Sequence, residues 1–288
     1  MKIALFGGTF DPVHLGHLAV AHAAAEKFDL NRIYFAPADL PPHKQKRQLI
    51  DFQHRFAMLA LATANDPRFV PSLLDAHTGQ PNYSIDTVRR LKSALKKSDK
   101  LYFLIGIDAF KDISIWYKPV ELLSEVEFIV VSRPGFSLAD VGRSLPEALR
   151  PTDLMLRVMK QQKSEGTIAL MGATIHLLGE VHEKISSTQI RAAAHKPVKA
   201  LSRYVPRLVA EYIKKEHLYT GGGKARSREA DPAPSGALQE HQQVIAKTKL
   251  QSGVERSDRE RDGANGRKML SFEEARPHGH AGRSHRNG

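Results

Sequence analysis

The sequence has no cysteine, a single tryptophan and few aromatic residues. The absence of cysteine excludes disulfides, thiolate catalysis, zinc–cysteine sites and iron–sulfur clusters. No apolar run approaches the roughly 20 residues that a membrane-spanning helix needs. The short apolar run at the N-terminus ends at glycine and is unlike a signal peptide. These absences predict a cytoplasmic protein without a membrane partner.

Acidic residues are also in deficit, with 31 Asp and Glu against 43 Lys and Arg, and the formal net charge is +12. A positive balance suits a polyanionic ligand, such as a nucleotide, a nucleic acid or an anionic membrane surface. Large apolar residues nearly vanish after the glycines at 221–223, where 13 basic and 9 acidic side chains follow. Such a segment buries too little apolar area to offset its ordering entropy. We therefore expect a folded domain over 1–220 and a disordered, mixed-charge basic tail over 221–288.

Short apolar runs alternate with helical patterns along the first 220 residues. The pattern predicts strands over 2–6, 32–37, 100–106, 126–132 and 173–178. It predicts helices over 15–28, 52–65 and 83–97, with Ser84 as an N-cap, and one last helix with apolar residues from Leu201 to Ile213. This alternation is typical of an α/β fold with a doubly wound parallel sheet. Such sheets bind ligands at the carboxyl ends of their strands, near the switch point.

The first candidate site is the turn after the first strand, where residues 7–17 read Gly-Gly-Thr-Phe-Asp-Pro-Val-His-Leu-Gly-His. Paired glycines let backbone N–H groups approach a ligand. His14 and His17 share one face of the following helix's first turn, where the helix end favours anions. A phosphate suits this pair better than a metal, for which Asp11 is the only further local ligand. The alternative is that both histidines only cap and pack the turn.

The second candidate site is the turn at 185–191, which reads Ile-Ser-Ser-Thr-Gln-Ile-Arg. Serine and threonine hydroxyls are typical N-caps and, with adjacent N–H groups, can bind an anion. Arg191 follows one turn later and faces the same way. A plain helix cap with an exposed arginine is the alternative. Together, the two turns predict a polyphosphate site held by two helix ends.

These two turns resemble the H-x-G-H and I-S-S-T-x-I-R motifs of the nucleotidyltransferase superfamily. More narrowly, residues 1–220 are similar to the bacterial nicotinate-nucleotide adenylyltransferases. Further motifs carry the resemblance: Leu40-Pro41-Pro42-His43-Lys44, Asn82-Tyr83-Ser84-Ile85-Asp86-Thr87, Gly106-Ile107-Asp108 with Trp116 after it, and Val131-Ser132-Arg133-Pro134-Gly135. The resemblance implies a Rossmann-like nucleotidyltransferase fold.

The resemblance also implies a reaction, the transfer of the adenylyl group of ATP to nicotinate mononucleotide, which yields deamido-NAD and pyrophosphate. The acceptor phosphate attacks the α-phosphorus directly and in line, without a covalent intermediate. Because this nucleophile is already an anion, positioning and charge stabilisation suffice. Mg²⁺ is expected to bridge the phosphate oxygens of ATP, with water and no assigned protein ligand.

Residue roles follow from the same resemblance. The catalytic groups would be His14, His17, Lys44 and Arg191. The ATP contacts would be Gly8, Thr9, Phe10, His17, Gly106, Asp108, Ser187, Thr188 and Arg191. The acceptor contacts would be Lys44, Thr87, Trp116 and Arg133. Among these, His17 would stabilise the α-phosphate and Trp116 would stack on the pyridine ring.

Other functions remain open at this stage. A related adenylyltransferase could use nicotinamide mononucleotide or phosphopantetheine as acceptor, and a cytidylyltransferase would share both turns. Mixed charge and scarce aromatics in the tail argue against nucleic acid as a partner, and the two intact turns argue against an inactive nucleotide sensor. The connection between Gly135 and Ile185 is long, which predicts an insertion at roughly 137–172 that forms an extra helix or an interface. Whether the chain forms a homo-oligomer stays open.

Overall fold

The computed structural model describes residues 1–42, 49–133, 135–161, 166–170, 172–179, 181 and 185–220. The predicted tail over 221–288 and the predicted phosphate contact Lys44 lie outside these residues. Among the residues that it does describe, no helix is long and apolar enough to cross a membrane.

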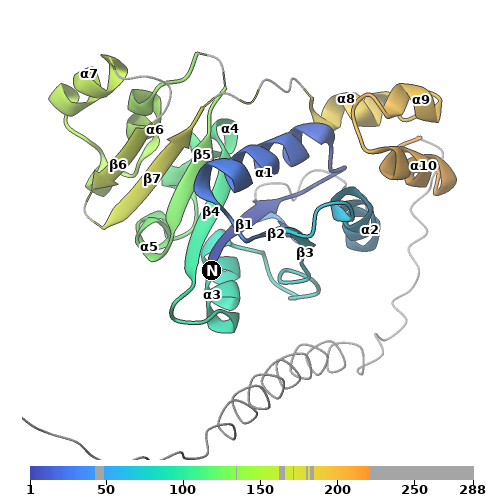
Figure 1. The fold of residues 1–288 in the computed structure, drawn as a ribbon, viewed down its shortest axis with the longest axis horizontal. Coiled ribbons are helices and arrows are strands. Elements are labelled where there is room, and N and C mark those ends of the chain that lie inside the picture. The colour runs from blue at the N-terminus through green and yellow to red at the C-terminus, as the bar shows by residue number, and fades with distance from the viewer. Residues whose placement is uncertain are drawn as a thin grey trace, which may run out of the picture. The chain divides into compact units, whose positions relative to one another are not determined.

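A single seven-stranded sheet forms the centre of the described part, with the strand order β3-β2-β1-β4-β5-β7-β6 (Figure 1). The strands are β1 (Lys2–Gly8), β2 (Arg32–Pro37), β3 (Phe69–Pro71), β4 (Lys100–Gly106), β5 (Glu127–Val131), β6 (Gly166–Leu170) and β7 (Ala173–Leu178). Neighbouring strands run parallel, except that β6 pairs antiparallel with β7 at one edge. The predicted doubly wound α/β sheet is confirmed, with this antiparallel edge strand added.

Helices cover both faces of the sheet (Figure 1). They are α1 (Leu15–Phe28), α2 (Phe52–Thr63), α3 (Ser84–Ala94), α4 (Ile107–Phe110), α5 (Pro119–Glu125), α6 (Leu138–Ser144), α7 (Asp153–Gln161), α8 (Ser187–Ala192), α9 (Val198–Leu201) and α10 (Arg207–Lys215), with 3₁₀ turns η2 (Ile113–Ile115) and η3 (Glu147–Leu149). The predicted insertion at 137–172 holds α6, α7 and β6.

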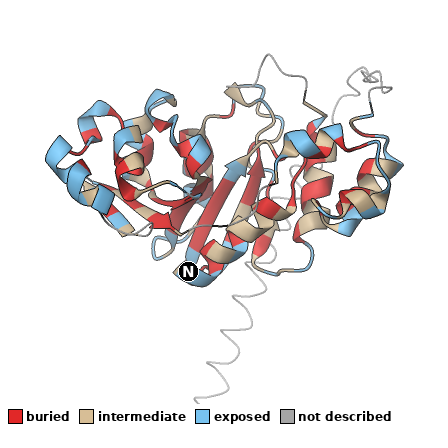
Figure 2. Cartoon of the chain, turned by 90° about the horizontal axis from the view of Figure 1, so that it is seen from above, coloured by how far each residue is buried: buried red, intermediate tan, exposed pale blue. Residues whose placement is uncertain are grey.

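The side chains of β1 alternate between two apolar cores. Ala4 and Phe6 pack in the core that contains buried residues of α1, α2 and α10. Ile3 and Leu5 pack in the core that contains buried residues of α3, α4, α5 and α6. Because the central strands are apolar on both faces, they are buried on both faces, as Figure 2 shows. This burial fixes the register of β1 and therefore the position of the loop that follows it.

The switch point of the sheet lies between β1 and β4. From β1 the chain moves outward to β2 and β3, whereas from β4 it moves the other way to β5 and β7. The carboxyl ends of β1 and β4 are therefore adjacent and diverge, which is where open α/β sheets bind ligands. Gly8 ends β1 and Gly106 ends β4. Two of the predicted site segments thus begin at this point.

Two local predictions were wrong. Ser84 is the first residue of α3 rather than its N-cap; Tyr83 holds that position and makes no capping bond with its side chain. The single last helix is divided into α9 and α10, because Pro206 lacks an N–H group and stands as the N-cap of α10. Its Leu208 is half exposed rather than buried.

Candidate active site

His14 and His17 form a reciprocal cap at the start of α1. His14 is the N-cap, and its Nδ1 accepts a hydrogen bond from the backbone N–H of His17 at 3.3 Å. The Nδ1 atom of His17 accepts from the backbone N–H of His14 at 3.2 Å, and the two rings stack with centroids 3.7 Å apart. Because a backbone N–H only donates, neither Nδ1 carries a proton. In its neutral form each ring therefore carries its proton on Nε2.

The charge state of His14 follows from its surroundings. The side chain is buried, and burial together with the positive charge of Arg133 lowers its pKa to about 4. His14 is therefore neutral at physiological pH and offers a hydrogen-bond donor without a positive charge. Both histidines lie where the sequence places them, side by side on the first turn of α1.

The turns at 7–17 and 185–191 contact each other directly. Arg191 donates from Nη1 to the carbonyl oxygen of Asp11 at 2.6 Å and from Nη2 to Oγ1 of Thr188 at 2.8 Å. Ser187 donates from Oγ to the carbonyl oxygen of Pro12 at 3.0 Å. The structure thus brings together two motifs that are more than 170 residues apart in sequence. In this arrangement Arg191 faces the first turn rather than bulk solvent.

Asp11 anchors that contact. Its carboxylate is buried, accepts a hydrogen bond from the Tyr219 hydroxyl at 2.9 Å, and lies 3.7 Å from Nη1 of Arg191. Tyr219 belongs to the segment after α10 and was not predicted as a site residue. No short motif marks it, since its role depends on where the end of the domain packs.

The helix α8 begins with a true capping box. Ser186 accepts the backbone N–H of Gln189 at its Oγ, and the Gln189 side chain accepts the N–H of Ser186. The hydroxyl cap predicted for this turn is therefore confirmed, with Ser186 as the N-cap. Ser187 and Thr188 are the first two helical residues.

The loop after β1 is shaped by Phe10. This residue has a φ of +48°, and its buried ring packs against His17 with centroids 5.0 Å apart. A Cβ atom at Gly8 would lie 3.1 Å from the Phe10 ring, so a side chain at that position would require the ring to shift by a few tenths of an ångström. The Phe10 side chain thus belongs to the core, so a nucleotide could contact Phe10 only through its backbone; the predicted backbone contacts of Gly8, Thr9 and Phe10 with a nucleotide remain a prediction.

The ends of β4 and β5 carry an ion pair. Asp108 follows Gly106 in α4, and Arg133 follows β5. Nη1 of Arg133 lies 2.8 Å from Oδ2 of Asp108, and both side chains are more than half exposed. The structure therefore joins a residue predicted to contact ATP with one predicted to contact the acceptor.

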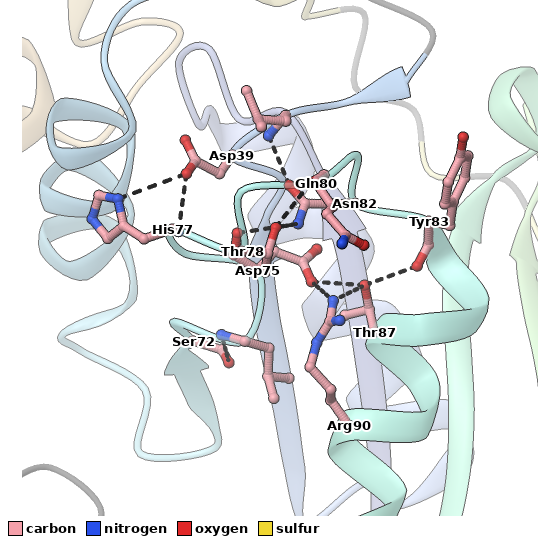
Figure 3. Close-up of polar contacts among 12 residues, drawn as sticks. Asp39, Ser72, Asp75, His77, Thr78, Gln80, Asn82, Tyr83, Thr87 and Arg90 are labelled. Atoms are coloured by element: carbon pink, nitrogen blue, oxygen red, sulfur yellow. Dashed lines mark hydrogen bonds and ion pairs between the residues drawn. The ribbon is translucent and has the colours of Figure 1, made fainter. Parts of the chain in front are cut away.

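Thr87 lies in a buried polar network at the start of α3 (Figure 3). Its hydroxyl donates to Oδ1 of Asp75 at 2.8 Å, and Arg90 donates to the same oxygen at 2.5 Å. Asn82 donates to the carbonyl of Asp75 at 3.2 Å. Burial raises the pKa of the Asp75 carboxyl. Asp75 was not among the predicted site residues. The Thr87 hydroxyl is thus engaged within the protein, and its predicted contact with the acceptor remains a prediction.

Trp116 lies between α4 and α5. It is half buried and packs edge-on against Phe103, with ring centroids 6.3 Å apart. The ring of its neighbour Tyr117 lies 4.4 Å from that of Tyr83 at the start of α3. The segments of Trp116 and Thr87 therefore contact each other through Tyr117 and Tyr83, while the acceptor contacts of both residues and stacking on a pyridine remain predictions.

Comparisons with known proteins show which proteins the chain resembles. Residues 5–193 match the family model described as cytidylyltransferase-like. A protein of Geotalea uraniireducens named "probable nicotinate-nucleotide adenylyltransferase" is 33% identical over 219 residues, which cover 76% of this chain and 98% of that protein. A protein of Solibacter usitatus with the same name is 47% identical over 135 residues, which cover 47% of this chain and 71% of that protein.

A solved structure shows the same fold. The Plasmodium falciparum nicotinic acid mononucleotide adenylyltransferase complexed with NaAD superposes with a TM-score of 0.56 at 20% identity. The similarity covers 76% of this chain and 97% of that one. The predicted Rossmann-like nucleotidyltransferase fold is confirmed.

Proposed function

The chain belongs to the nicotinate-nucleotide adenylyltransferase family, and from this membership we propose that it transfers the adenylyl group of ATP to nicotinate mononucleotide. The products are deamido-NAD and pyrophosphate. The observation that carries the proposal is the docking of the 185–191 turn, through Arg191 and Ser187, onto the loop that leads to His14 and His17. It gathers the two signature motifs at the switch point of the sheet.

A 5′-phosphate oxygen of the acceptor attacks the α-phosphorus of ATP, and the bond from that phosphorus to the bridging oxygen of pyrophosphate breaks. The nucleophile is an anion at neutral pH, so the site needs no strong base. The imidazoles of His14 and His17 supply Nε2–H donors for the α-phosphate oxygens, where negative charge increases in the transition state. Their shared cap holds both rings in place before the substrate arrives.

Cations and backbone groups hold the remaining phosphates. Arg191 and the hydroxyls of Ser187 and Thr188 face the β- and γ-phosphates in this proposal, together with Lys44. The backbone of Gly8, Thr9 and Phe10 contacts the nucleotide, and Gly106 and Asp108 contact the adenosine. Thr87, Trp116, Arg133 and Lys44 surround the acceptor.

Nucleotidyltransferases of this family generally use Mg²⁺, and we assign the ion to the ATP substrate, bridging its phosphate oxygens. The chemistry of the nearby donors supports this assignment. Asp11, the carboxylate closest in sequence to the two histidines, already accepts from Tyr219 and faces Arg191. Within the described ranges no group of three His, Asp or Glu side chains is arranged to hold a metal. Bound Mg²⁺ would neutralise phosphate charge.

Pyrophosphate release tests the proposal. The purified protein is given ATP and Mg²⁺ with nicotinate mononucleotide, nicotinamide mononucleotide or phosphopantetheine in separate reactions. We expect the fastest release with nicotinate mononucleotide. Release with phosphopantetheine alone would overturn the acceptor assignment and leave adenylyl transfer standing. We also propose that the protein acts in the cytoplasm.

A further inference from the structure

Arg55 lies in α2 with only 1% of its surface exposed, outside every motif that the sequence analysis singled out. Its guanidinium donates to backbone carbonyl oxygens throughout. Nη1 donates to Thr9 at 3.0 Å and to Ala38 at 2.6 Å, and Nε donates to Ile50 at 3.0 Å. Nη2 makes a longer contact with the carbonyl of Asp39, at 3.4 Å.

These carbonyls belong to three separate segments around the candidate active site. Thr9 lies in the loop after β1, Ala38 and Asp39 follow β2, and Ile50 precedes α2. The loops after β1 and β2 also meet directly, since the N–H of Ala38 donates to the carbonyl of Gly8 at 2.9 Å. One side chain therefore connects the predicted nucleotide loop after β1 to the neighbouring loop after β2 and to the start of α2.

The connection continues toward the acceptor side. Leu40 and Asn82 exchange two hydrogen bonds: the N–H of Leu40 donates to the Asn82 side chain at 2.7 Å, and the N–H of Asn82 donates to the Leu40 carbonyl at 3.0 Å. Asn82 in turn donates to the carbonyl of Asp75, in the network of Figure 3. Arg55 thus contacts the carbonyl of Asp39, and the next residue, Leu40, is hydrogen-bonded to Asn82 of the Thr87 network.

A buried cation is costly unless its donors are satisfied. A planar guanidinium with donors in fixed directions can serve several carbonyls at once, which an ammonium cannot do with the same geometry. The peptide between Thr9 and Phe10 is rigid and planar, so a fixed Thr9 carbonyl also fixes the Phe10 N–H, which lies in the same plane and points in the opposite direction. Arg55 therefore controls where this backbone donor points.

We propose that Arg55 is a positioning residue for adenylyl transfer, which fixes the Thr9–Phe10 peptide and the loop after β2 in the geometry that binds ATP. The inference rests on the proposed function but concerns a residue that the function does not assign. Arg55 touches no substrate in this role; it acts through the carbonyls that it holds.

The test compares Arg55→Lys and Arg55→Ala with Met58→Ala. Met58 is fully buried one turn later on α2, and its side chain packs in the apolar core. Its truncation reports what loss of packing in this helix does by itself. Each variant is measured for thermal unfolding, for Mg·ATP binding by calorimetry, and for pyrophosphate release with nicotinate mononucleotide, below its melting temperature.

We expect Arg55→Lys to stay folded while kcat/KM for ATP falls about tenfold or more, equivalent to about 1.4 kcal/mol of transition-state stabilisation. ATP affinity should fall as well. Guanidinium ion at millimolar concentration should restore part of the activity of Arg55→Ala, and the same concentration of ethylammonium should not. Met58→Ala should melt earlier and keep the ATP affinity and turnover of the folded wild type.

Wild-type ATP affinity and turnover in folded Arg55→Lys would overturn the inference, and so would equal losses in Met58→Ala. Should Arg55→Ala fail to fold, Arg55→Lys decides, because it keeps the charge and nearly the length of the side chain. A wild-type protein that binds ATP but releases no pyrophosphate would contradict the proposed function instead. The change in ATP affinity would then still test Arg55.

Discussion

The imidazoles of His14 and His17 cap each other's backbone, since the Nδ1 atom of each accepts the N–H of the other at 3.2–3.3 Å. Each ring therefore uses one nitrogen for structure and keeps the proton of its neutral form on the other. The cap belongs to the fold, whereas the Nε2–H belongs to the chemistry. The two roles can be separated by substitution.

His17→Asn should separate them. Residue 17 is the N3 position of α1, where an asparagine side-chain oxygen can accept the N–H of His14 as Asp140 accepts the N–H of Ser137 in α6, so the free energy of unfolding should change by less than about 1 kcal/mol. The Nε2–H donor is lost, and kcat should fall by about 10²- to 10³-fold. Urea unfolding and pyrophosphate release measure the two effects. The control is His22→Asn. His22 lies further along α1, and its half-exposed imidazole is 3.5 Å from the carboxylate of Asp66. Near-normal turnover in His17→Asn would contradict the assigned role.

The lowered pKa of His14 predicts a pH dependence of stability. Its pKa is about 4 in the folded state, below the ordinary value of 6.5. Between these pH values the unfolded chain binds more protons than the folded chain. The contribution of His14 to the free energy of unfolding is therefore fully present above pH 6.5 and is lost as the pH drops toward 4. Between pH 7.5 and pH 5 the expected loss is about 2 kcal/mol.

His14→Asn is the matched variant for this measurement, because asparagine can cap but does not titrate. Urea unfolding at pH 7.5 and pH 5 should show a loss for the wild type that is about 2 kcal/mol greater than for the variant. An equal loss of stability between pH 7.5 and pH 5 in both proteins would show that groups other than His14 cause the loss.

Arg191→Lys tests the contact between the two turns. A lysine ammonium cannot reproduce the fork that joins the Asp11 carbonyl to the Thr188 hydroxyl. We expect kcat/KM for ATP to fall about tenfold or more. Arg207→Lys is the control, since Arg207 is 82% exposed and pairs with Glu211 on the surface of α10. Equal activity of the two variants would contradict the proposed role of Arg191 in ATP binding.

The sequence predicted the sheet well where strands are long and apolar on both faces, as at 2–6 and 100–106. It missed β3, which has three residues, and β6, where buried and exposed positions alternate. In the site, the turns at 7–17 and 185–191 were predicted from contiguous motifs and contact each other. Arg55 was not, because one polar residue in an amphipathic helix looks the same whether it faces solvent or distant backbone carbonyls, and Asp75 was not, because no motif distinguishes a buried carboxylate in the turn after β3. Their partners are set by tertiary packing alone.

The ion pair between Asp108 and Arg133 predicts opposite effects on the two substrates. A pair this exposed contributes about 0.2–1 kcal/mol, so a nucleotide can displace it at small cost. Asp108→Asn should raise KM for ATP, because a charged acceptor for ribose hydroxyls is lost. Arg133→Gln should raise KM for nicotinate mononucleotide and leave KM for ATP unchanged or lower. Initial rates with each substrate varied in turn would decide, and a rise in both constants for Arg133→Gln would contradict the division.

Thr87 and Thr63 make a matched pair for the network of Figure 3. Both are buried threonines in helices, but the Thr87 hydroxyl donates to the Asp75 carboxylate whereas that of Thr63 donates to the Leu59 carbonyl of its own helix. Thr87→Val leaves a buried carboxylate with one donor fewer, which should cost about 1–3 kcal/mol of stability. Thr63→Val should cost about 1 kcal/mol or less, because its lost bond joins neutral groups.

Thr87→Ser keeps the hydroxyl and should restore most of that stability. Urea unfolding of the three variants measures the costs, and KM for nicotinate mononucleotide reports on the start of α3. If Asp75 positions this segment for the acceptor, KM should rise in Thr87→Val, return in Thr87→Ser and stay unchanged in Thr63→Val. A stability loss in Thr87→Val without any rise in KM would confine the network to holding the fold.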